Sequence, residues 1–166
     1  MQLILGRALP VLAALAMMTG GSPLAAQAAN KTSPGACSLL TKELVLQVIP
    51  EPDKAALEGR FRSPPEEHRL GPDRSLCAYA GLTVHLNPFH AESFEAGLRK
   101  DKSWVPIPGL GDAAWFHDVP GFMGELYVRS GRRNLGVGIE IPEGRTAESV
   151  KPAAVALAKA VLARPW

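Results

Sequence analysis

The chain has 166 residues, of which 46% are hydrophobic and 20% charged, and its formal net charge is +2. This length suits a single domain with one hydrophobic core and leaves no room for two full domains. The nearly balanced charge excludes the strongly basic surface that indicates a nucleic acid or an anionic membrane as a partner.

The first 28 residues have the features of a secretory signal peptide. Arg7 supplies a positive charge, and residues 8–18 carry none. Such a run is too short to cross a bilayer of roughly 30 Å as a helix. The segment ends in Ala26-Gln27-Ala28, which has the small residues of a cleavage site. We expect cleavage after Ala28, a periplasmic location and no stable membrane insertion. A retained anchor is the alternative, which the glycines and proline of residues 20–23 disfavour.

The two cysteines, Cys37 and Cys77, lie in the part that would be exported. Exported compartments permit disulfides, so this pair predicts one structural bond. The alternatives are a redox pair, which normally has Cys-x-x-Cys spacing, and lipidation of Cys37. We expect residues 29–36 to form a flexible tail and residues 37–166 to form a single α+β domain.

A first helix is predicted to begin after Thr41, which has Glu43 in its first turn, and to end by Pro50. Its apolar face consists of Leu44, Val45, Val48 and Ile49. A short second helical turn is expected over residues 53–58. Residues 59–74 are rich in proline, glycine and charge, which predicts a long exposed loop.

Alternating apolar residues then predict strands over residues 75–80 and 82–87, with a bulge or tight turn at Gly81. Residues 91–100 predict a helix. Its inward side chains would be Phe94 and Leu98.

Residues 104–112 contain two prolines and two glycines, which predict irregular structure. Three further strands are expected over residues 113–117, 122–129 and 135–141. Thr146 is expected to cap a final helix. That helix has an apolar stripe of Val150, Ala154, Leu157 and Val161. The order predicts an α+β fold in which helices cover an antiparallel sheet of about five strands.

Several short motifs resemble a known group. They are Cys37-Ser-Leu-Leu-Thr41, Cys77-Ala-Tyr79, Gly109-Leu-Gly-Asp112 and Leu126-Tyr-Val-Arg129, followed by an alanine-rich terminal helix. Together they resemble small exported bacterial proteins of uncharacterised function, and are similar to actinobacterial lipoproteins whose domain opens with a Cys-x-Leu-Leu-Thr helix. The resemblance implies a fold related to the PsbP-like sandwiches and supplies no catalytic residues. Unlike the lipoproteins, this chain lacks a lipobox.

The histidines have no spacing of a recognisable zinc site. They are His68, His85, His90 and His117. His85 and His90 could converge with His117 and Met123 near a hairpin, and such a set in an exported protein would suit copper. Ordinary surface histidines are the simpler reading, so no metal ligand and no cofactor is assigned.

No catalytic motif is evident in the sequence. It has neither a Gly-x-Ser-x-Gly elbow nor a phosphate-binding loop. The pairs Gly109-Leu-Gly111 and Gly136-Val-Gly138 lack the third glycine of a dinucleotide fingerprint, so close packing or turn geometry accounts for them. We therefore expect no enzyme activity and name no catalytic residue.

A binding site is predicted from aromatic and apolar residues in and near the irregular segment. These residues are Trp104, Ile107, Leu110, Trp115 and Phe122. Clustered aromatics in loops are typical of recognition sites, although the same side chains could instead cap the end of the sheet. The expected function is that of an exported, non-enzymatic accessory or binding protein with a protein or small-molecule partner. The alternatives are a copper-binding accessory protein and an inhibitor or immunity protein for another exported protein.

Overall fold

The computed structural model describes residues 34–51, 53–88 and 91–166, all of which belong to one compact unit, residues 31–166. The expected signal peptide, residues 1–28, lies outside the described residues. Within the described part, no helix is both long and apolar enough to span a membrane.

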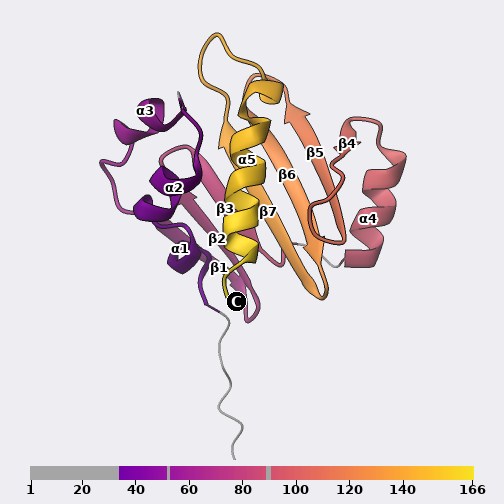
Figure 1. The fold of residues 1–166 in the computed structure, drawn as a ribbon. Helices are drawn as coiled ribbons and strands as arrows, with labels where there is room; N and C mark the ends of the chain where they lie inside the picture. Colours follow the sequence, from indigo (N-terminus) through magenta and orange to yellow (C-terminus); the bar gives the residue numbers. More distant parts are fainter. Residues whose placement is uncertain (1–33, 52, 89–90) are drawn as a thin grey trace, which may run out of the picture. The chain divides into compact units, whose positions relative to one another are not determined.

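The centre of the fold is one seven-stranded sheet in which every pair of neighbouring strands is antiparallel (Figure 1). The strand order is β1-β2-β3-β7-β6-β5-β4. The strands are β1 (Glu66–Gly71), β2 (Arg74–Tyr79), β3 (Leu82–Leu86), β4 (Trp104–Pro106), β5 (Ala113–Val119), β6 (Met123–Ser130) and β7 (Arg133–Glu140). The α+β class with an antiparallel sheet is therefore confirmed, but the expected number of about five strands is wrong.

The two additional strands, β1 and β4, are the edges of the sheet. β1 lies inside residues 59–74, which were expected to be a loop, and β4 lies inside residues 104–112, which were expected to be irregular. An edge strand pairs on one side only, so it tolerates polar residues and a terminal proline such as Pro106. Neither strand therefore shows the alternating apolar pattern from which strands were predicted.

Four helices lie on one face of the sheet. The long helix α5 (Ala147–Leu162) crosses β6 and β7, and α2 (Lys42–Val48) packs beside it (Figure 1). The short helices α1 (Ala36–Leu39) and α3 (Asp53–Glu58) complete this layer. The predicted apolar stripe of α5 is buried. Gly124 on β6 lets α5 pack closely against the sheet, because a Cβ at this position would lie 2.7 Å from the Phe116 ring and 2.9 Å from the Val150 side chain.

The two predicted helix caps differ in outcome. The Thr41 side chain accepts a hydrogen bond from the Leu44 backbone N–H at 3.2 Å, which confirms it as the cap of α2. Thr146 occupies the same position before α5, but its side chain makes no capping bond. The Ser149 hydroxyl instead donates to the Thr146 carbonyl at 2.6 Å.

The predicted disulfide joins Cys37 in α1 to Cys77 in β2, with an S–S distance of 2.05 Å and a Cα–Cα distance of 4.8 Å. The residue before it, Ala36, is fully buried. The Ala36 N–H lies 3.0 Å from a carboxylate oxygen of Glu67 and 2.9 Å from the hydroxyl of Ser75, both of which accept from it. Ala36 thus belongs to the folded domain and not to the tail expected over residues 29–36.

The Gly109-Leu-Gly-Asp112 motif has a structural role. Gly111 has a φ of +60°, and a Cβ there would lie 2.3 Å from the Arg129 carbonyl oxygen. Asp112 accepts hydrogen bonds from the Gly131 N–H at 2.7 Å and from the Arg129 guanidinium at 3.2 Å. The motif therefore holds the segment before β5 against the β6–β7 turn, and Gly111 shows both the close packing and the turn geometry that the sequence allowed.

The fifth helix, α4 (Ala91–Lys100), packs on the opposite face, near the β4 edge. Leu98 forms a small second core with Trp115 and Tyr127. An ion pair between Glu95 of α4 and Arg129 of β6 fastens the helix to the sheet. Because these contacts involve β5 and β6, the middle of this face, around β7 and β3, is left open.

Candidate ligand-binding groove

Cross-strand pairing places polar and aromatic residues in two rows on the face opposite α5. One row runs through Thr83, Gly138, Glu125, His117 and Trp104. The other runs through His85, Gly136, Tyr127 and Trp115. β7, the central strand, contributes only the glycines Gly136 and Gly138 to these rows. With no side chains there, the face is hollowed along β7 between the side chains of the neighbouring strands.

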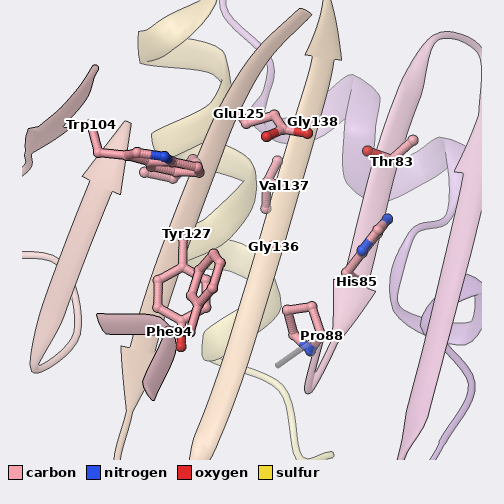
Figure 2. A pocket seen from close by; sticks show the side chains of 11 residues that line it. Thr83, His85, Pro88, Phe94, Trp104, Glu125, Tyr127, Gly136, Val137 and Gly138 are labelled. Atoms are coloured by element: carbon pink, nitrogen blue, oxygen red, sulfur yellow. The ribbon is translucent and has the colours of Figure 1, made fainter. Parts of the chain in front are cut away.

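A groove of about 190 Å³ follows β7 at this place, and we call it the open-face groove (Figure 2). Figure 2 shows Trp104, Phe94 and Tyr127 on one side of β7, with Thr83, His85 and Pro88 on the other. The residues that line it are Thr83, His85, Pro88, Phe94, Trp104, Glu125, Leu126, Tyr127, Gly136, Val137 and Gly138. Its surface is mainly apolar with a few polar groups, as is typical of small-molecule sites.

The two glycines of β7 contribute differently. A Cβ at Gly138 would lie 2.4 Å from the Thr83 hydroxyl oxygen, so close packing requires this glycine, as the sequence predicted. A Cβ at Gly136 would lie 3.3 Å from the Cβ of His85, a tight contact that a small shift would relieve. Gly136 is therefore the position at which a methyl group could be added to the floor of the groove.

Stacked rings build the wall on the β4 side. The Trp104 and His117 rings lie 4.8 Å apart at an interplanar angle of 22°. Phe94 meets Trp104 edge to face at 6.2 Å and Tyr127 at 4.8 Å. Such offset and edge contacts hold aromatic rings in defined orientations. The wall is thus a fixed aromatic surface.

Tyr127 is anchored below this wall. Its hydroxyl donates a hydrogen bond to the side-chain oxygen of Asn134 at 3.0 Å. Burial, and then the negative charge of Glu95, raise the pKa of Tyr127 to about 12. Tyr127 is therefore neutral at physiological pH and presents its ring to the groove.

His85 forms part of the opposite wall. Burial, and then the positive charge of Arg74, lower the pKa of His85 below its ordinary value. The Arg74 guanidinium donates to the Pro88 carbonyl at 2.8 Å. At neutral pH the His85 ring is therefore uncharged.

Glu125 lies on β6 between His117 and Gly138, and its side chain is half-buried at the Gly138 end of the groove (Figure 2). Within the described part of the chain, Glu125 has no hydrogen bond or ion pair. The guanidinium of Arg129, four residues further along β6, is engaged by Glu95 and Asp112. Glu125 is thus the negative group that the groove offers to a ligand.

The structure does not gather the five predicted binding residues into one surface. Trp104 lines the groove, and Trp115, only 6% exposed, packs beside Tyr127 in the second core. Leu110 is buried and Ile107 half-buried against the main core, on the other face. Phe122 is 57% exposed in the turn before β6. Only Trp104 therefore belongs to the open-face groove.

The proposed convergence of histidines does not occur among the described residues. His85 on β3 and His117 on β5 have β7 and β6 between them, a separation of about 14 Å across the sheet. His68 lies exposed on β1, and His90 lies outside the described residues. Met123 packs near Gly138. No group of three potential metal ligands is found in the described part of the chain.

Most residues of the groove, including Glu125, Tyr127 and Gly136, were not predicted from the sequence as binding residues. A usable signal was present in β7, where glycines alternate with Leu135, Val137 and Ile139. A strand with large residues on one face and only glycine on the other predicts a hollow on the second face. This pattern could not identify the residues that form the walls of the groove, because those residues depend on the order and register of the strands.

Comparisons with known proteins find no significant match: no family model, no curated protein and no solved structure is similar to this chain. Any function must therefore be inferred from the open-face groove and from the sequence.

Proposed function

We propose that this protein is an exported, non-enzymatic binding protein whose ligand lies in the open-face groove. The observation that carries the proposal is the glycine floor at Gly136 and Gly138 between two walls of fixed side chains. Concave, mainly apolar sites with a few oriented polar groups are where proteins hold small ligands. The groove volume of about 190 Å³ suits a small molecule or one part of a larger one.

The polar groups of the groove favour binding over catalysis. His85 and Glu125 stand on strands separated by β7, and among the described residues no hydrogen bond or ion pair joins their side chains. An acid–base pair or an activated nucleophile needs its groups within hydrogen-bond reach of a common atom. The groove presents these side chains as separate contact points for a ligand.

The distribution of exposed apolar side chains favours a ligand in the groove over a protein partner that binds an apolar surface patch. Among the described residues, the large exposed ones are Leu70, Val105 and Phe122. Leu70 lies on β1 and Val105 on β4, which are opposite edges of the sheet. Scattered single apolar residues are ordinary on protein surfaces and do not indicate an interface.

A fragment screen followed by amide chemical shifts tests the proposal. We expect small ring compounds to shift the amides of Gly136 and Gly138 and the indole N–H of Trp104. The Gly136→Ala variant places a methyl group in the floor and should weaken these hits. The Gly97→Ala variant is the control, since nothing lies within 4 Å of a Cβ there. If no fragment shifts these signals, or if hits map elsewhere, the proposal fails.

Export is the second part of the proposal and is supported by the sequence of residues 1–28. Expressed from the full sequence in a bacterium, the mature protein should begin at Ala29 and appear in the periplasmic fraction. N-terminal sequencing that finds Met1 on the product would contradict it. We also propose a relation to the PsbP-like sandwiches, which is supported by an antiparallel sheet carrying helices on its faces.

A further inference from the structure

The aromatic wall and Glu125 together suggest the chemical class of the ligand. Glu125 offers a half-buried carboxylate for which the described residues provide no cationic partner. A cationic ligand could form an ion pair with this carboxylate, an interaction that no described residue provides. The Gly138 end of the groove therefore presents a negative group that a cation could bind.

The rings beside Glu125 would favour the same charge. Phe94, Trp104 and Tyr127 line the groove, and their faces carry negative potential. His117 covers one face of Trp104 at 4.8 Å and thereby fixes the indole at the groove edge. A cation placed against such rings is attracted without needing a hydrogen-bond donor.

Positive charge in the surrounding residues does not cancel this preference. Arg129 is neutralised by Glu95 and Asp112. Arg74 donates to the Pro88 carbonyl at the His85 end, away from Glu125. His117 is the titratable cross-strand neighbour of Glu125, and its ring is stacked on Trp104.

We propose that the open-face groove binds a small organic cation, an ammonium or quaternary ammonium group on an apolar body. The ammonium lies between the Glu125 carboxylate and the Trp104 and Phe94 rings, and the apolar part lies over Gly136 toward His85. This inference rests on the proposed function, since it names the ligand class of the same groove.

Choline and its neutral isostere 3,3-dimethylbutan-1-ol provide the test, because they differ in charge and hardly in shape. Titrations followed by the Gly136 and Gly138 amides should show choline binding roughly tenfold more tightly than the neutral compound. The Glu125→Gln variant should remove most of this preference. The Glu66→Gln variant, which changes an exposed carboxylate of β1, should keep it. Thermal unfolding checks that both variants fold.

A second variant separates the aromatic contribution from the charge of Glu125. Trp104→Leu keeps an apolar side chain but removes the ring, so it should weaken choline binding and leave the neutral isostere nearly unchanged. If the isostere binds the wild type as well as choline does, the cation inference is overturned while the groove remains a binding site. If neither compound binds but other fragments shift the same amides, the inference is again overturned and the proposed function stands. If no fragment binds, both fail.

Discussion

The carboxylate of Glu67 accepts a hydrogen bond from the backbone N–H of Cys37 at 2.7 Å, and its other oxygen accepts one from Ala36 at 3.0 Å. A side chain of the edge strand β1 thus satisfies the first amides of α1, which have no partner within the helix. The same helix carries the disulfide to β2. Glu67 of β1 therefore helps to hold α1 where its Cys37 can form the disulfide with Cys77 of β2.

Replacing Glu67 with alanine should lower the free energy of unfolding by about 1–3 kcal/mol, because two helix amides lose a charged acceptor. Glu66→Ala is the matched control, since that side chain is exposed and its only ion pair among the described residues is with His68 at 3.9 Å. Chemical denaturation should show a change within about 0.5 kcal/mol for the control. Equal effects of the two variants would mean that Glu67 does not cap α1.

Removing the disulfide should destabilise the domain without abolishing the groove. A bond that closes a 40-residue separation restricts the unfolded chain, and its loss typically costs about 2–5 kcal/mol. The measurement compares denaturation midpoints of the wild type and the Cys37→Ala, Cys77→Ala double variant. Two free thiols titrated in natively purified protein would contradict the bond itself.

The two tryptophans of the β4–β5 pair should respond differently to truncation. Trp115 is only 6% exposed, so Trp115→Ala should cost about 3–5 kcal/mol of unfolding free energy. Trp104 is half-buried on an edge strand, so Trp104→Ala should cost about 1–3 kcal/mol and chiefly weaken fragment binding. If Trp104→Ala unfolds the domain as readily as Trp115→Ala, Trp104 is a core residue and not a wall of the site.

His85 should make stability depend on pH in the mildly acidic range. Its pKa is lowered by burial and by Arg74, so below about pH 6.5 the unfolded chain binds a proton more readily than the folded protein does. The unfolding free energy should therefore fall as pH drops through this window toward the folded-state pKa. His85→Gln should flatten that part of the curve, whereas His68→Gln, an exposed change on β1, should not. An unchanged slope in His85→Gln would contradict the lowered pKa.

Much of the fold could be predicted because its helices and central strands carry strong local patterns. Thr41 precedes α2 as expected, and the stripe of α5 from Val150 to Val161 is buried. The strand β1 could not be predicted in this way, because every residue of it except Gly71 is exposed and no alternating apolar pattern marks it. It exists because β2 folds back against it as a hairpin and because Glu67 caps α1, a contact between residues that lie 30 positions apart in the chain.

The site was harder to predict than the fold. Trp115 and Phe116 are adjacent in sequence, yet alternation along β5 places them in different cores on opposite faces. The predicted binding set of aromatic and apolar residues close in sequence therefore combined Trp104, which lines the groove, with Leu110, which lies in the main core. Apart from Phe94 of the neighbouring helix α4, the residues that share the groove with Trp104 come from β3 and the segment just after it, from β6 and from β7, so the order and register of the sheet are needed to identify them.

A crystal structure of the protein with a bound fragment is the decisive test of the open-face groove as a ligand site. We expect electron density for the fragment over Gly136, with Trp104 on one side and His85 on the other, and no density at that place in the Gly136→Ala variant under the same conditions. Fragments bound reproducibly at another surface, with the open-face groove holding only water, would contradict it.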